Sequence, residues 1–269
     1  MTAKGLRELL ASGQFTVEDG ALVIARDLDP HVASEQALGT LERLADEVAT
    51  PLDRHASVGR QLETLREVLY GRFGLRGNTE NYDDPQNSVL PAVLERRLGI
   101  PISLAVVVMA VSRRAGVVAE GISFPGHFLL RIGGPAGHVV DPFHALTPLG
   151  PEELRSLYRR ATRTDGFDSF VLRAATSRDI WIRMLSNPRL IFDRGKDHGR
   201  SLVVLNRLVE LDAGPTAVRD RGLAALELGA SAQAEQDLST YLTMLPRAID
   251  RADVQRALDR ARRAPTCWN

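Results

Sequence analysis

A histidine and an aspartate with complementary chemistry occur in the segment FPGHFLLRIGGPAGHVVDPF, residues 124–143. Apolar runs on both sides of GGPAG predict two strands joined by a turn. If the turn is centred between Gly133 and Gly134, His127 and Asp141 face each other or nearly so, with Cβ atoms ~4.5–5.5 Å apart. A carboxylate at that distance orients an imidazole. The pair therefore supplies two of the three members of a nucleophilic hydrolase site.

A structural interpretation of the same residues stays open. His127 is then a core histidine, and Asp141 begins the turn Asp-Pro-Phe. Two more histidines, His138 and His144, flank Asp141 and raise the question of a metal site. Neither a second carboxylate nor a cysteine cluster accompanies them, so we expect no metal and no other cofactor.

The elements around these residues indicate an α+β fold. Pro101 suits the first position of a helix, and almost every residue from Ile102 to Val111 is apolar, which predicts a helix buried on all sides. A short helix is expected before it, ended by Gly99. Residues 75–88, rich in Asn, Asp, Gly and Pro, predict a loop. Strands that follow a buried helix favour a sheet packed on that helix.

Helical patterns flank this central part. Residues 1–74 are expected to form an N-terminal helical segment, and residues 75–150 the core with the hairpin. Residues 151–269 predict a helical region that resembles a tetratricopeptide-type array, with a period of ~34 residues. The array is too short to stand alone, so we expect it to dock on the core.

Composition limits the classes of function. The chain has 269 residues, a formal net charge of zero and 44% hydrophobic residues, which is ordinary for a globular protein. We expect no nucleic-acid partner and no membrane partner from this charge balance. The single cysteine, Cys267, excludes an internal disulfide framework and a thiolate-rich metal site. The N-terminus lacks a signal-peptide pattern and the apolar run 104–111 is short, so a cytoplasmic protein is expected.

Three segments together resemble the SirB family of bacterial transglutaminase-like proteins. They are NSVLPAVLERRLGIPISLAVVVMAVSRRAGV, GISFPGHFLLRI and VVDPF, and the resemblance extends from about Ala21 to the last helix. It implies a transglutaminase-like, papain-like core followed by tetratricopeptide-type helices. It also implies a Cys–His–Asp site in which His127 and Asp141 are the second and third members. The position expected for the cysteine, counted from Gly99, is Pro101, which has no nucleophile.

Ser103, in the first turn of the same helix, is the nearest hydroxyl and the candidate replacement. A serine there usually hydrogen-bonds to free backbone amides, and a helix dipole activates a hydroxyl far less than a thiol. We therefore interpret Ser103 as structural, and a nucleophilic role for Cys267 in the C-terminal tail is a weak alternative. The resemblance also places Asn78, Tyr82 and Asn87 beside the cleft as ligand-binding candidates, although turn formation and helix capping explain Asn87 as well.

Two functions remain from different classes. The first is a module that lacks cysteine catalysis and binds a peptide, protein or small ligand in the cleft, with a protein or peptide partner on the tetratricopeptide-like helices. The second is an acyl-transfer enzyme or hydrolase that uses His127 and Asp141 with Ser103 or an activated water.

Overall fold

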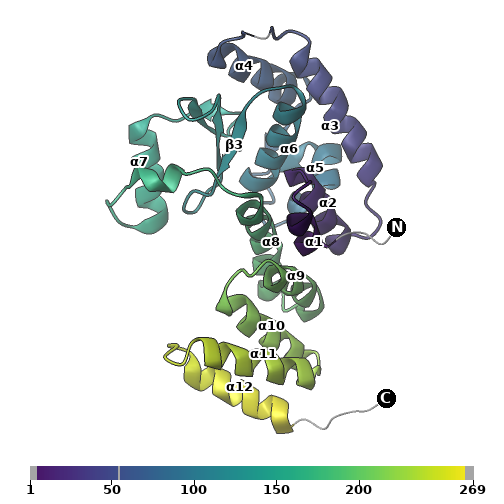
Figure 1. Cartoon of the computed structure of the whole chain (residues 1–269), viewed down its shortest axis with the longest axis vertical. Coiled ribbons are helices and arrows are strands. Elements are labelled where there is room, and N and C mark those ends of the chain that lie inside the picture. Colours follow the sequence, from purple (N-terminus) through teal and green to yellow (C-terminus); the bar gives the residue numbers. More distant parts are fainter. Residues whose placement is uncertain (1–4, 54, 264–269) are drawn as a thin grey trace. The chain divides into compact units, whose positions relative to one another are not determined.

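The computed structural model describes residues 5–53 and 55–263. They form two compact units, one of Gly5 with Leu9–Met184 and one of Leu6–Glu8 with the residues from Leu185 on. The first unit contains, in chain order, α2 (Val17–Leu28), α3 (Ser34–Ala49), α4 (Val58–Leu65), the π-helix η1 (Arg66–Arg72), β1 (Arg76–Gly77), the 3₁₀ helix η2 (Pro85–Ser88), α5 (Leu90–Arg96), β2 (Leu98–Gly99), α6 (Pro101–Arg114), β3 (Ala119–Ile122), β4 (Leu129–Ile132), β5 (His138–Asp141), β6 (Thr147–Pro148), α7 (Pro151–Thr162) and the 3₁₀ helix η3 (Ser169–Leu172) (Figure 1). Helices α1 (Leu6–Ser12) and α8 (Ser177–Arg194) each contribute residues to both units.

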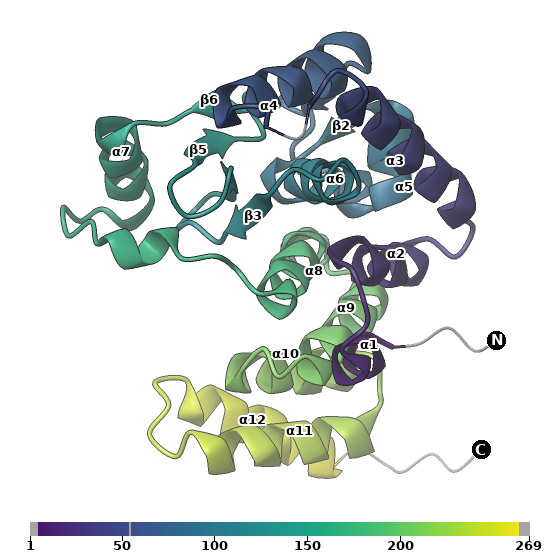
Figure 2. The same ribbon diagram turned by 45° about the horizontal axis from the view of Figure 1, so that its top comes forward.

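The predicted α+β class is confirmed, and helix α6 is its centre. Pro101 is the first residue of α6, as expected, and all its other residues up to Ser112 are buried except the half-buried Met109. Strands β3 and β4 contact α6. On the other side of the sheet, Ile122, Phe124 and Leu129 pack with Leu154 of α7. The sheet thus lies between α6 and α7 (Figure 2).

The four-stranded sheet is antiparallel, in the order β3-β4-β5-β6, with a hairpin register that differs from the predicted one. Leu130 pairs with Val140 and Ile132 with His138, so the strand position opposite Asp141 is that of Leu129. His127 therefore precedes the ladder by two residues. The reason is the turn, in which Gly137 donates a hydrogen bond to Gly134 O, so that the whole segment from Gly133 to Gly137 forms the connection.

Helix α5 ends differently from the prediction. Its last residue is Arg96, and Arg97, not Gly99, adopts the left-handed conformation that ends the helix, with φ 58°. Gly99 instead belongs to β2, which pairs in parallel with β1. A glycine is required there for another reason, because a Cβ atom would lie 2.7 Å from the Ser103 hydroxyl oxygen. The close approach of strand and helix therefore depends on Gly99.

An aromatic contact anchors α8 to α2 within the first unit. Trp181 is fully buried, and its indole N–H donates a hydrogen bond to Val17 O at 2.9 Å. Its ring lies directly over Gly20, where a Cβ atom would be 2.0 Å from the indole. Phe15 packs against the same ring, with centroids 5.3 Å apart. Gly20 is thus the position that lets the two helices approach.

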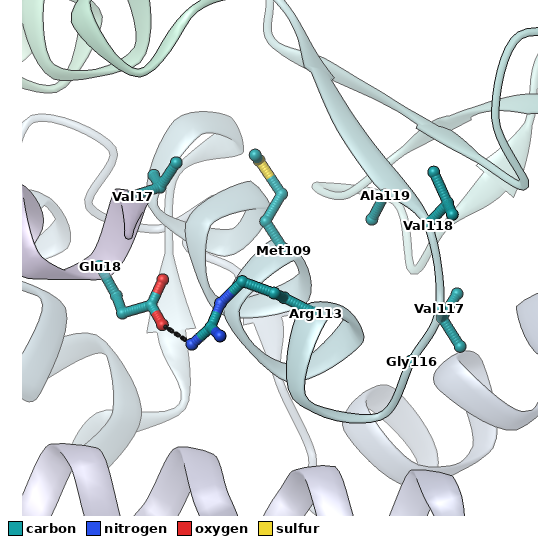
Figure 3. Close-up of a pocket in the computed structure, with 8 residues that line it drawn as sticks. All are labelled: Val17, Glu18, Met109, Arg113, Gly116, Val117, Val118 and Ala119. Atoms are coloured by element: carbon teal, nitrogen blue, oxygen red, sulfur yellow. Dashed lines mark hydrogen bonds and ion pairs between the residues drawn. The ribbon is translucent and has the colours of Figure 1, made fainter. Parts of the chain in front are cut away.

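The buried carboxylate of Glu18 joins α2 to the C-terminal end of α6 through ion pairs with two arginines. The Glu18 carboxylate is 2.7 Å from the Arg113 guanidinium (Figure 3). It is also 2.5 Å from the guanidinium of Arg114. Burial raises the pKa of Glu18, but the hydrogen bonds from Arg113 and Arg114 and the charge of Arg114 outweigh it and hold the pKa below its ordinary value. The carboxylate is therefore ionised and paired at neutral pH.

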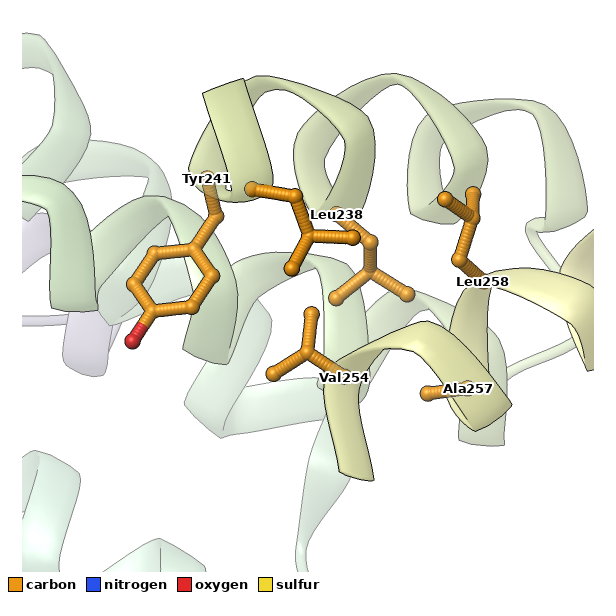
Figure 4. Close-up of a cluster of buried hydrophobic side chains, with 6 residues drawn as sticks. Leu238, Tyr241, Val254, Ala257 and Leu258 are labelled. Atoms are coloured by element: carbon orange, nitrogen blue, oxygen red, sulfur yellow. The ribbon is translucent and has the colours of Figure 1, made fainter. Parts of the chain in front are cut away.

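The second unit is helical. It contains α9 (His198–Glu210), α10 (Pro215–Glu227), α11 (Ser231–Met244) and α12 (Arg251–Arg263). Six buried side chains form a core between α11 and α12, namely Leu238, Tyr241, Leu242, Val254, Ala257 and Leu258 (Figure 4). The guanidinium of Arg221 makes two hydrogen bonds of 2.7 Å to the buried Asp237, which links α10 to α11. Within the described residues, none of the helices has the length and apolar composition needed to cross a membrane.

The Trp181 contact predicts an unusually strong effect of adding one methyl group. Gly20→Ala is expected to lower the free energy of unfolding by about 1–3 kcal/mol, because the new Cβ atom overlaps the indole. Gly39→Ala on the exposed side of α3, where nothing lies within 4 Å, is the matched control and is expected to leave stability unchanged or raised by about 0.5–1 kcal/mol. Urea denaturation of both variants measures the difference. Equal stability of the two variants contradicts the described packing.

The Glu18 ion pair predicts an acid-sensitive contribution to stability. Because its pKa is lower in the folded chain than the ordinary 4.5, this contribution is complete above about pH 4.5 and is lost as the pH falls through the folded-state pKa. Glu18→Gln is expected to lower stability at pH 7 by about 1–3 kcal/mol and to flatten the decline below pH 4.5. Denaturation curves between pH 7 and pH 3, with the exposed Glu80→Gln as control, measure both effects. An unchanged slope in the Glu18 variant refutes the assignment.

Candidate functional site

The imidazole of His127 and the carboxylate of Asp141 form a direct hydrogen bond. His127 Nε2 lies 3.0 Å from Asp141 Oδ2, with 17% of the histidine side chain and 6% of the aspartate side chain exposed. An ionised carboxylate only accepts hydrogen bonds, so Nε2 carries the donated proton. In the neutral ring, Nδ1 then keeps a free electron pair and acts as the basic nitrogen. The contact between these two residues was predicted correctly from the sequence, but from a hairpin register that the structure does not have.

A tight turn before β4 brings the His127 side chain to Asp141, although the two residues are not opposite each other in the sheet. The His127 N–H donates a hydrogen bond to Phe124 O, which closes the turn before β4. Gly126 in this turn has φ 68°, and a Cβ atom there would lie 2.9 Å from the Ala161 side chain of α7. Glycine is therefore needed both for the backbone conformation and for the contact with α7.

Asp141 accepts two further hydrogen bonds. His144 Nδ1 is 2.8 Å from Asp141 Oδ2, and the Phe143 N–H donates to Oδ1 at 2.8 Å. Burial raises the pKa of Asp141, but hydrogen bonds from His127, His144 and the Phe143 N–H, with the charge of His127, hold the pKa below its ordinary value. The carboxylate is consequently ionised at neutral pH and orients two imidazoles at once.

A buried tyrosine supports the turn after Asp141. Tyr70, in the π-helix η1, donates a hydrogen bond of 2.6 Å to Pro142 O. Burial, followed by the nearby charge of Asp141, raises the pKa of Tyr70, so its hydroxyl stays a donor. Sequence reasoning missed this residue because the segment has an ordinary helical pattern, and a π-helix has no distinct sequence signature.

The loop ahead of α5 reaches the same turn through Phe143. The Phe143 ring lies against Gly77, where a Cβ atom would be 2.6 Å away, and the Tyr82 ring packs edge-on against Phe143 with centroids 6.0 Å apart. The Tyr82 side chain is also 46% exposed. Of the three predicted ligand-binding residues of the loop, Tyr82 is therefore the exposed one, and it contacts Phe143, two residues after Asp141.

The other two predicted residues form the internal scaffold of the loop. Asn78 donates a hydrogen bond to the side chain of Asn87, whose own amide donates to Asn81 O and Tyr82 O. Both side chains are buried, with 4% and 0% exposure. Their amides stabilise the conformation that presents Tyr82.

Ser103 makes the backbone contacts expected of a serine at a helix start. Its hydroxyl donates to Ile100 O at 3.2 Å and accepts from Ile100 N–H at 3.1 Å, and the side chain is fully buried. Both polar functions of the hydroxyl are thus engaged at the N-terminus of α6. Cys267, the other nucleophile considered, lies outside the described residues.

A pocket of about 420 Å³ adjoins the dyad. Asp141 and His144 line it together with residues of α7, among them the charged Glu152, Glu153 and Arg160, whereas His127 is not among its lining residues. The sequence raised His144 only as a possible metal ligand. Its hydrogen bond to Asp141 was not predicted, because it depends on the conformation of the turn that follows β5. Among the described residues, no group of three or more His, Cys, Asp or Glu side chains is arranged to hold a metal ion.

Comparisons with known proteins place this chain in a family. A family model described as the transglutaminase-like superfamily matches residues 35–186. A UPF0162 protein of Xylella fastidiosa is 35% identical over 232 residues, which cover 84% of this chain and 83% of that protein. A UPF0162 protein of Pseudomonas aeruginosa is 30% identical over 216 residues, or 79% of this chain and 77% of that protein.

A shorter similarity extends to a eukaryotic protein. F-box only protein 21 of Mus musculus is 40% identical over 83 residues, which are 30% of this chain and 13% of that protein. No solved structure matches the chain significantly. The family model covers more than half of the chain, including α6, the whole sheet and both members of the dyad. This chain belongs to the transglutaminase-like superfamily.

Proposed function

We propose that this chain is a binding module that holds a peptide or another small ligand beside His127 and Asp141, without cysteine-based acyl transfer. The observation that carries the proposal is the N-terminus of α6. Pro101 occupies the position where the resemblance implies a cysteine, and the neighbouring Ser103 hydroxyl is engaged by Ile100 at 3.1 and 3.2 Å. A hydroxyl held in this way lacks the adjacent base that activates a nucleophile.

The dyad itself suits recognition. The pocket lined by Asp141 has the size of a small-molecule or side-chain site. Tyr82, outside this pocket, is an exposed aromatic residue that contacts Phe143. The basic Nδ1 of a neutral His127 accepts a hydrogen bond from a ligand N–H or O–H group. His144 and the charged residues of the pocket supply further polar contacts.

The second candidate is a hydrolase in which His127 activates a water molecule. The observation that favours it is the 3.0 Å hydrogen bond between His127 and an ionised Asp141, because that bond sets the tautomer a general base needs. The alternative in which Ser103 is the nucleophile requires this serine to leave its contacts with Ile100.

One set of variants separates these functions. We expect wild-type protein to bind members of a fluorescent peptide library without hydrolysing or transferring their amide groups. His127→Ala is expected to change peptide affinity several-fold, whereas Ser103→Ala lowers stability by about 0.5–2 kcal/mol and leaves affinity unchanged. Fluorescence anisotropy measures binding, and mass spectrometry of the peptides measures turnover.

The control is His138→Ala, which removes an exposed histidine at the start of β5. Peptide hydrolysis that is lost in His127→Ala and kept in Ser103→Ala overturns the binding proposal in favour of an activated water. Loss of turnover in both variants identifies Ser103 as the nucleophile. Peptide affinity that is the same in wild type, His127→Ala and His138→Ala refutes a ligand site at the dyad.

We also propose that the chain is a member of the SirB family, located in the cytoplasm, with a tetratricopeptide-type array in the second unit. Helix α11 begins about 33 residues after α9, close to the ~34-residue period of such repeats. The array binds a protein or peptide partner through exposed apolar side chains such as Met244 and Ile249.

A peptide array tests the partner site. The purified chain is expected to retain a set of peptides that is lost when Met244→Lys and Ile249→Asp are combined, since both side chains are exposed and their replacement leaves the core intact. Retention of the same peptides by the double variant contradicts this surface as the binding site.

A further inference from the structure

A second pocket in the first unit has the chemistry of an anion-binding site. It has a volume of about 520 Å³ and lies between the α2–α3 turn, α3, η2 and α5. It shares no lining residue with the pocket beside Asp141. A space of this size fits a small molecule.

Two guanidinium groups converge on one aromatic ring in this pocket. The Arg43 carbon Cζ lies 5.9 Å from the centroid of Phe73, and that of Arg97 lies 5.2 Å from it. The arginines come from different elements, α3 and the end of α5, and all three residues line the pocket. Cation–π contacts compensate part of the cost of placing two positive charges around one ring.

The contact with Phe73 leaves N–H donors of Arg97 available. The guanidinium carbon lies over the ring, and a guanidinium in a cation–π contact still offers N–H groups to an oxyanion. Arg43 also pairs with Glu47 at 2.6 Å. Among the residues that the structure describes, no carboxylate is within ion-pair distance of Arg97.

The backbone fixes the origin of the Arg97 side chain. Arg97 ends α5 in the left-handed conformation, and its carbonyl accepts a hydrogen bond of 2.9 Å from Arg76 N–H. This anchoring fixes the backbone position from which the Arg97 side chain extends to Phe73.

Half of the other residues that line the pocket are polar, and half are apolar. Gln36, Thr40 and Gln86 provide neutral donors and acceptors, which suit hydroxyl or amide groups of a ligand. Two acidic residues also line the pocket. Asp29 uses one carboxylate oxygen to accept the His31 N–H at 3.0 Å, and Glu95 is exposed.

We propose that this pocket binds a small metabolite that carries a carboxylate or a phosphate together with neutral hydrogen-bonding groups. Arg97 is the main anion contact, Arg43 the second, and Gln36, Thr40 and Gln86 contact the neutral part. The site acts independently of His127 and Asp141.

Isothermal titration calorimetry with three probes tests the proposal. Malate represents a carboxylate ligand, glucose 6-phosphate a phosphate ligand, and glucose the neutral control. We expect the protein to bind at least one of the two anions more tightly than glucose. Arg97→Gln is expected to weaken that binding about tenfold or more, because it removes charge-assisted hydrogen bonds, and Arg97→Lys is expected to weaken it less because the charge remains.

Arg163→Gln is the matched control, because Arg163 also follows a helix in the left-handed conformation and does not line this pocket. It is expected to leave the affinity unchanged, as is His127→Ala, which separates this site from the dyad. Absence of binding of both anions at millimolar concentration overturns the proposal. Equal weakening by Arg97→Gln and Arg163→Gln, with both variants folded by circular dichroism, also overturns it.

Discussion

The buried carboxylate of Asp141 holds together the segments that make up the candidate site. It accepts hydrogen bonds from His127 in the turn before β4 and from His144 and the Phe143 N–H in the turn after β5. A buried charge without hydrogen-bond donors is strongly unfavourable. The three donors together therefore stabilise the ionised carboxylate in this position. The dyad geometry consequently depends on satisfying this carboxylate more than on the strand register. This explains why the contact forms even though His127 lies outside the ladder.

The start of α6 is also strongly constrained, and its contacts engage the hydroxyl that could otherwise act as a nucleophile. Gly99 allows the Ser103 hydroxyl to approach β2, and the hydroxyl in turn caps the helix through Ile100. On the neighbouring strand, Gly77 receives the Phe143 ring. The structure therefore combines an oriented histidine with a helix start in which the available hydroxyl is already occupied. This combination distinguishes the proposed binding module from a nucleophilic enzyme.

Local chemistry made several features predictable from the sequence. Pro101 and the apolar run after it defined a buried helix, and the two apolar runs around GGPAG defined a hairpin. The register was not predictable, because it depends on a hydrogen bond between Gly137 and Gly134 inside a loop of small residues. The end of α5 was also predicted wrongly. Glycine is the usual residue in the left-handed conformation, and here Arg97 adopts it while Gly99 serves close packing.

The π-helix Arg66–Arg72 has a consequence for how this chain tolerates length changes. A π-helical turn accommodates more residues than an α-helical turn, so the segment behaves as an α-helix that carries an inserted residue. Deleting one residue between α4 and Tyr70 would remove this insertion and restore α-helical winding, and the residues after it would keep nearly the same orientation around the axis. The Tyr70 hydroxyl would then stay on the side of the helix that faces Pro142, which it now contacts at 2.6 Å. The π-helical turn is thus a place where the chain tolerates the loss of one residue without losing the support of Asp141, whereas the same deletion in an uninterrupted α-helix rotates the following side chains by about 100°.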